Sequence, residues 1–170
     1  MVEIETVFSW LKRFRASRLV TPATTLRDQI ADRIRTGDFI RTYKLIEYLE
    51  TSAVALNDKF DTGDISAEIG LAFYQMGNLQ KAEEYWLKAR ADYNDCHEGA
   101  IISWLLGAVR WQIDIRNRFA LNDWKTAIRE FRDLANKAER DRLEDTYNWY
   151  EARIPELEKC LAEQISIKFP

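Results

Sequence analysis

The chain has 170 residues, 46% of them apolar and 31% charged, with a formal net charge of −3. This balance is typical of one soluble globular domain, and it argues against a disordered chain and against a DNA binder with a strongly basic surface. No run of 18 apolar residues and no N-terminal signal sequence is evident, so we expect a cytoplasmic protein without a membrane span. Only six Gly and three Pro occur, which favours long helices.

The first expected element is an amphipathic helix within residues 1–20. Val7, Trp10, Leu11 and Phe14 recur at helical spacing, and basic residues flank them. We expect this helix to cap the fold. Docking on a partner and lying on an anionic membrane surface are the alternatives.

Three turn signals follow along the chain. Each joins a Gly or Asn that can end a helix to an Asp or Asn that can cap the next one. They are Gly37-Asp38-Phe39, Gly77-Asn78-Leu79 and Asn122-Asp123-Trp124. Because apolar residues recur at helical spacing around each turn, we predict about three helical hairpins over residues 24–138.

The C-terminal part is expected to form two capping helices within residues 141–166. The first is predicted over residues 141–153, and the second begins at Pro155, since proline is well accepted in the first turn of a helix. Charged residues on the second helix would supply the polar outer face that the end of a repeat array needs.

Residues 64–89 combine small side chains where two helices would touch with large ones that fill the space between them. The pattern consists of Ile69-Gly70, Phe73, Gly77, Ala82, Trp86 and Ala89. In this it resembles the tetratricopeptide-repeat family, with departures at Ser66 and Asn94. The resemblance implies an all-α fold over residues 1–170. Antiparallel hairpins would stack as a short right-handed superhelix with extra end helices.

The flanking units match this pattern less completely. In the third unit we align Gly107 with Gly70, and we align Ala127, Phe131 and Leu134 with the second helix of the repeat. This register leaves extra residues in segment 114–121, which would form a longer helix or a loop.

The resemblance also implies a concave groove lined by the first helix of each hairpin. Phasing from the glycines and the first turn assigns six candidate partner-binding residues to it: Arg27, Arg35, Tyr74, Gln75, Trp104 and Trp111. Arg110 is a seventh candidate, which would add charge at the edge of the groove. Aromatic residues and Arg carry much of the binding energy at interfaces. The sequence therefore predicts an adaptor or regulatory subunit that binds a peptide or helix of another protein. The alternative for Trp104 and Trp111 is a place in the core.

Catalytic signatures are lacking in the sequence. It has one histidine and no Gly-rich phosphate loop, nucleophile elbow or zinc-protease motif, so we expect no enzyme activity, no cofactor and no metal. His97 is expected in the loop before a helix, in a capping or surface role. Cys96 and Cys160 lie far apart and are expected to be free thiols.

Other functions stay open at this point. A pocket near Trp104 and Arg110 would suit a small helical enzyme or a small-molecule binder. Arg110, Arg116 and Arg118 cluster with Asp114 as a possible ion-pair partner, and with stacked Trp rings they could serve a nucleic-acid-associated accessory protein. The negative net charge counts against nucleic acid, and self-association is a further option.

Overall fold

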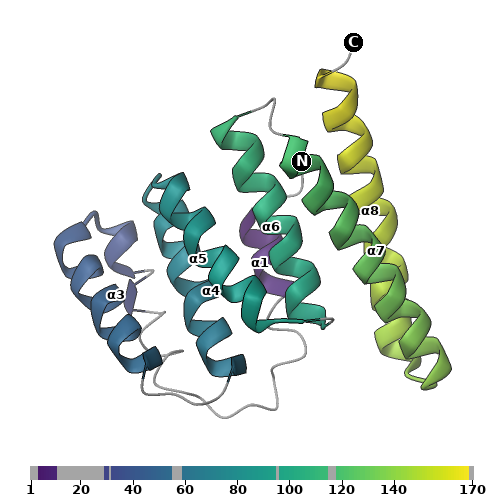
Figure 1. Cartoon of the computed structure of the whole chain (residues 1–170), viewed down its shortest axis with the longest axis horizontal. Helices are drawn as coiled ribbons and strands as arrows, with labels where there is room; N and C mark the ends of the chain where they lie inside the picture. The colour runs from purple at the N-terminus through teal and green to yellow at the C-terminus, as the bar shows by residue number, and fades with distance from the viewer. Residues whose placement is uncertain are drawn as a thin grey trace. The chain divides into compact units, whose positions relative to one another are not determined.

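The computed structural model describes residues 4–10, 29–30, 32–54, 59–94, 96–114 and 118–168. Over these ranges the chain forms helices and no strand, so the predicted all-α class is confirmed (Figure 1). The chain divides into two compact units. Unit 1 comprises Met1–Arg13 and Asp95–Pro170, and unit 2 comprises Phe14–Asn94.

The described part of unit 2 contains the long helices α3 (Phe39–Val54), α4 (Lys59–Gln75) and α5 (Leu79–Asp92). Residues 32–35 before α3 are helical too. α4 and α5 form an antiparallel hairpin, and α3 packs against α4. This unit therefore has the hairpin connectivity that the turn signals predict.

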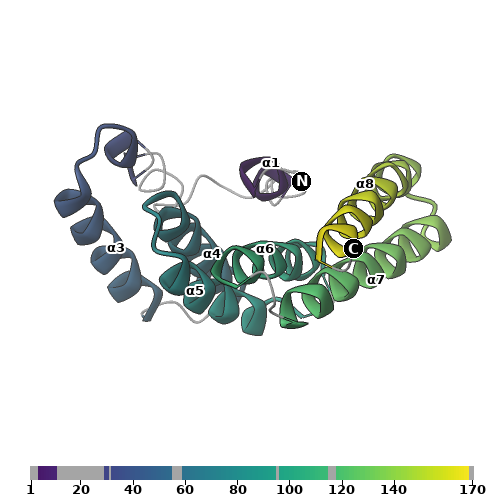
Figure 2. The same cartoon turned by 90° about the horizontal axis from the view of Figure 1, so that it is seen from above.

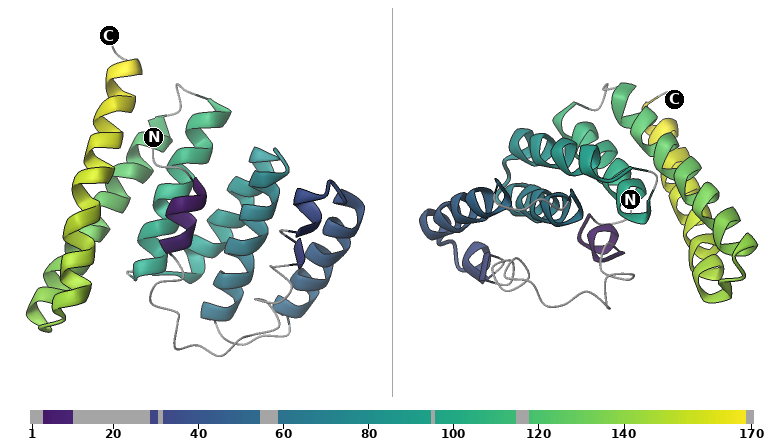
Figure 3. Two further views of the ribbon diagram at one scale, coloured as in Figure 1. Left: turned by 180° about the vertical axis from the view of Figure 1, so that it is seen from behind. Right: turned by 60° about the horizontal axis from the view of Figure 1, so that its bottom comes forward.

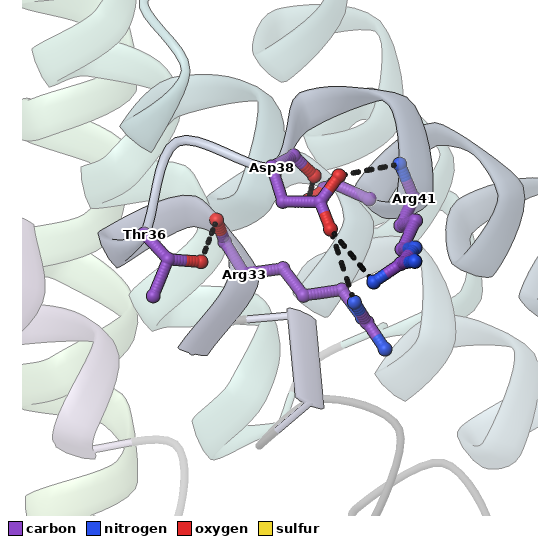
Figure 4. A network of polar contacts seen from close by, with 5 residues as sticks. Arg33, Thr36, Asp38 and Arg41 are labelled. Carbon is purple, nitrogen blue, oxygen red and sulfur yellow. Dashed lines mark hydrogen bonds and ion pairs between the residues drawn. The ribbon is translucent and has the colours of Figure 1, made fainter.

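The turn before α3 is built around Asp38 (Figure 4). Gly37 takes the left-handed conformation, with φ of 74°, and ends the preceding helical segment. Asp38 then caps α3, because its Oδ1 accepts a hydrogen bond from the Arg41 backbone N–H at 3.3 Å. Its Oδ2 also pairs with the guanidinium groups of Arg33 at 3.2 Å and Arg41 at 3.5 Å. The predicted turn and cap are confirmed here.

The turn before α5 repeats this design. Gly77 has φ of 78°, and Asn78 Oδ1 accepts from the Lys81 backbone N–H at 3.1 Å. Without such a cap the first N–H groups of α5 would lack a partner.

The α4–α5 hairpin closes on a contact between a glycine and an indole ring. A Cβ at Gly70 would lie 2.4 Å from Trp86 Cδ1, so only glycine leaves room for the ring. Trp86 Nε1–H donates to the Ala67 carbonyl at 3.1 Å, and both Trp86 and Ala82 are fully buried. The predicted close contact at Gly70 and the burial of Trp86 are confirmed.

Unit 1 contains α1 (Ile4–Trp10), α6 (His97–Ile113), α7 (Arg118–Arg140) and α8 (Glu144–Lys168). α7 packs against both α6 and α8, and α1 packs against α6. The sequence of α6 is apolar on nearly all sides, which is typical of a central, buried helix.

The predicted turn at residues 122–124 is wrong, since these residues lie inside the continuous helix α7. Asp123 does not cap a helix there. Its carboxylate instead forms an ion pair with Arg110 of α6 at 2.8 Å. α6 ends at Ile113 and α7 begins at Arg118, so residues 118–121 of the predicted segment form the first turn of a longer α7. Residues 115–117 lie outside the described ranges.

The register proposed for the third unit also changes. A Cβ at Gly107 would lie 2.4 Å from Trp124 Cδ1, and Trp124 Nε1–H donates to the Trp104 carbonyl at 3.1 Å. This is the geometry of Gly70 and Trp86. The equivalent of Trp86 is therefore Trp124 and not Phe131.

The C-terminal residues form one helix where two were predicted. α8 continues through Pro155, whose side chain is exposed. The turn lies earlier, at residues 141–143. There Arg142 has φ of 58°, and the Leu143 N–H donates to the Ala138 carbonyl at 2.8 Å. This left-handed residue ends α7 in the way that a glycine more often does.

Candidate functional site

Four of the predicted partner-binding residues belong to unit 2. Arg27 lies outside the described residues. Arg35 is exposed and pairs with Asp32 at 3.4 Å, Tyr74 stacks on Trp86 with ring centroids 6.0 Å apart, and Gln75 is exposed. Their role in binding a partner stays a prediction.

The other three belong to unit 1 and gather around Trp124. The ring centroids of Trp104 and Trp111 lie 5.6 and 5.5 Å from that of Trp124, and only 1% of Trp104 is exposed. Arg110 forms an ion pair with Asp123 of α7 at 2.8 Å. These two tryptophans therefore fill the core between α6 and α7, which is the alternative that the sequence left open.

A different group of aromatic residues in unit 1 surrounds helix α1. α1 lies to one side of α6 when the molecule is viewed from above (Figure 2) and in front of α6 when it is viewed from behind (Figure 3, left), and the two helices are in contact. Its buried residues Ile4, Val7 and Trp10 are three apart and lie along one side of the helix. The described part of the N-terminal helix thus packs on unit 1, although residues 14–94, which follow it in the sequence, belong to unit 2.

Trp10 enters a pocket to which α7 and α8 contribute aromatic rings. Its ring meets Phe131 edge-on, with centroids 6.3 Å apart, and Trp149 at 5.7 Å and 89°. The Arg153 guanidinium lies 5.5 Å from the centroids of both Trp10 and Trp149. Edge-to-face ring pairs and cation–π contacts both depend on the aromatic character of Trp10.

His97, in the first turn of α6, connects this pocket to the backbone of α1. Its Nε2 lies 2.8 Å from the Trp10 carbonyl oxygen, and its Nδ1 lies 3.1 Å from the Tyr150 hydroxyl. Because a carbonyl only accepts, Nε2 carries the proton, and in the neutral ring Nδ1 accepts from Tyr150. The predicted surface or capping role for His97 is wrong, since only 6% of the residue is exposed and its ring contacts both α1 and α8.

The Tyr150 hydroxyl and the Cys96 thiol have raised pKa values. Burial, with a smaller contribution from the nearby Glu98 carboxylate, raises the pKa of the Tyr150 hydroxyl. Burial also raises the pKa of the Cys96 thiol to about 11. At neutral pH the Tyr150 hydroxyl therefore keeps the proton that it donates to His97.

Two surface hollows lie elsewhere. One, of about 530 Å³, lies in unit 2 and is bordered by Tyr43, Phe73 and Tyr85. Positively charged lysines and negatively charged glutamates complete its border. The other, of about 320 Å³, lies between α7 and α8 beside the Arg132–Glu158 ion pair. Across the described ranges, no His, Cys, Asp and Glu residues group as a metal site would require.

No helix in the described part of the chain combines the length and apolar character needed to cross a bilayer. No protein-family model, curated protein or solved structure matches this chain.

Sequence reasoning missed this pocket because its members are far apart along the chain. His97 is 87 residues from Trp10 and 53 from Tyr150. Two local signals did exist. The only histidine opens a strongly apolar helix, and Trp149 and Tyr150 are adjacent in the segment predicted as the first capping helix.

Proposed function

We propose that this chain is a protein-interaction module that binds an amphipathic helix of a partner on unit 1. The binding surface is the helix-docking face, formed by α6, α7 and α8 and defined by His97, Phe131, Trp149, Tyr150 and Arg153. The observation that carries the proposal is α1, a short helix of the chain itself that is seated on this face.

The contacts of α1 are those of a helix bound in a groove. One side of the helix is buried, and Thr6 on another side is exposed. Recognition of a helix through residues three or four apart is a recurrent mode of peptide binding. The face also contributes Trp, Tyr and Arg, the residue types that dominate interface energies.

The chemistry of the face favours binding over catalysis. Both nitrogens of His97 are engaged, one by a main-chain carbonyl and the other by Tyr150. A general base must instead present a nitrogen to a substrate. Cys96 and Cys160 are free thiols, which is usual in a reducing compartment and supports a cytoplasmic location.

The repeated contact between glycine and tryptophan supports a divergent tetratricopeptide-like architecture. In both the α4–α5 and the α6–α7 hairpin, an indole ring packs against a glycine. The indole N–H donates a hydrogen bond to the carbonyl of the residue three positions before that glycine. We propose that the chain is built from such hairpins, with α1 and α8 as added elements.

The test uses a fluorescein-labelled peptide of residues 1–13 and full-length protein. Trp10→Ala should weaken the docking of the chain's own helix and leave the face open to the peptide. In the wild type, α1 competes as an intramolecular ligand at roughly millimolar effective concentration. We expect saturable binding to the variant, at least about ten-fold tighter than to the wild type.

The matched control is Tyr48→Ala, which removes an exposed aromatic residue of α3 in unit 2. It should bind the peptide as weakly as the wild type does. If folded Trp10→Ala protein shows no saturable binding, the helix-docking face is not a binding site and the proposal is wrong.

A further inference from the structure

We infer that the partner's helix carries a tryptophan, which takes the place of Trp10 on the helix-docking face, and that α1 must leave before the partner binds. This inference rests on the proposed function and specifies the chemistry of the partner. Its recognition pattern would be an aliphatic residue, a second one three residues later, and a tryptophan three residues after that.

The pocket selects an aromatic guest because its contacts depend on a π system. The side chains of Phe131, Trp149 and Arg153 meet the ring from two helices. A leucine at this position would lose the attraction of Arg153 and both edge-to-face contacts. It would also leave part of the pocket unfilled.

The imidazole of His97 fixes where the tryptophan must sit along the partner's helix. Its buried Nε2–H donates to the carbonyl of the same residue that fills the pocket. Because a buried donor without an acceptor costs free energy, a partner has to bring a carbonyl to the same place. In this tautomer Nε2 presents a donor to the partner's carbonyl while Nδ1 accepts from the Tyr150 hydroxyl.

The position three residues earlier restricts the partner as well. Val7 is fully buried and Ile4 is nearly so, in a helix that packs against α6. A large side chain at the place of Val7 would be overpacked. The tryptophan and the two aliphatic residues together define one face of the partner's helix.

The test measures the binding of three peptides to full-length Trp10→Ala protein by fluorescence anisotropy. The first has the sequence of residues 1–13, the second carries Trp10→Leu, and the third carries Ser9→Trp with Trp10→Ser. The third has the same composition as the first but moves the indole about 100° around the helix. We expect the second and third to bind at least ten-fold more weakly than the first.

A second variant of the protein separates ring recognition from general apolar burial. Arg153→Met, added to Trp10→Ala, keeps an apolar stem but removes the cation. This substitution should weaken the binding of the tryptophan peptide several-fold and leave the binding of the leucine peptide unchanged. Circular dichroism of both proteins at the same temperature shows whether they are equally folded.

The outcomes distinguish the inference from the proposed function. If the tryptophan and leucine peptides bind equally, selection for tryptophan is wrong and helix binding stands. If the peptide with the shifted indole binds as well as the first, the position set by His97 is wrong. If no peptide binds to the folded variant, the proposed function fails together with this inference.

Discussion

Two glycines in this chain hold their positions because an indole ring occupies the space of a side chain. Gly70 faces Trp86 and Gly107 faces Trp124, and in each case a Cβ would lie 2.4 Å from the ring. Such a distance forces a shift of the ring or of the helix. In an open helix alanine would instead stabilise by about 1 kcal/mol relative to glycine.

Gly107→Ala should therefore destabilise the protein, by about 1–3 kcal/mol, in spite of the better helix propensity of alanine. Urea unfolding followed by circular dichroism measures the change. In the double variant with Trp124→Phe, which has a smaller ring, the added cost of the alanine should shrink. A gain in stability from Gly107→Ala alone would show that the two helices are not in close contact at this glycine.

The Cys96 thiol should be unreactive at neutral pH. Burial raises its pKa from the ordinary 9.0 to about 11, and the thiolate is the species that reacts with iodoacetamide. In a Cys160→Ala background, the rate of alkylation should continue to rise beyond pH 10. A rate that levels off near pH 9 would contradict the burial of this thiol.

The same shift predicts a dependence of stability on pH. The folded protein holds the Cys96 proton to a higher pH than the unfolded chain does. The stabilisation is therefore complete below the unfolded pKa and is lost as the pH rises towards 11. The difference in unfolding free energy between the wild type and Cys96→Ala should change in this direction between pH 8 and pH 10.5.

Among the elements, α8 is the one whose sequence fits its structure least well. Pro155 lies inside the helix, so the carbonyl one turn earlier lacks an N–H donor at this position. The Pro155 side chain is exposed, so its ring contributes little buried surface in return.

Pro155→Ala should raise the midpoint of thermal unfolding. An interior proline costs up to about 3 kcal/mol relative to alanine, and each 1 kcal/mol corresponds to roughly 2–4 °C in a chain of this size. Lys159→Ala, another exposed site on α8, serves as the control and should change the midpoint little. An unchanged or lower midpoint for Pro155→Ala would mean that the helix already compensates for the missing donor.

The hairpins could be predicted where the deciding signals are local. Gly37 and Gly77 need left-handed backbone, and Asp38 and Asn78 cap the next helix, so both turns of unit 2 follow from short segments. Asn122-Asp123 carries similar residue types but no glycine. It continues the helix because Asp123 finds its partner in Arg110 of the neighbouring helix.

The register of α7 was open to prediction from a second local pattern. Ala82, Trp86 and Ala89 have the same spacing as Ala120, Trp124 and Ala127, and all six side chains are buried. The register proposed from the sequence pairs Trp86 with Phe131 instead. The docking of α1 could not be predicted in the same way, since helical spacing gives Trp10 a buried face but does not identify the helices that bury it.

At the scale of the whole molecule, α1 belongs to unit 1, although residues 14–94, which follow it in the sequence, belong to unit 2. The chain passes from unit 1 into unit 2 at residue 14 and returns at residue 95. The α6–α7 and α7–α8 hairpins join consecutive helices, so release of α1 leaves their connections intact. A helix attached in this way can act as a competitor for an external ligand.

The central claim is that α1 and a partner's helix compete for one face. The direct measurement is 19F NMR of full-length wild-type protein labelled with 5-fluorotryptophan, in which a Trp10→Phe variant identifies the Trp10 signal among the six tryptophans. Unlabelled peptide of residues 1–13 is then added to saturation. We predict that the Trp10 signal moves to the position of a solvent-exposed indole while the signals of Trp86 and Trp104 stay unchanged. A Trp10 signal that keeps its position at saturating peptide would contradict the claim.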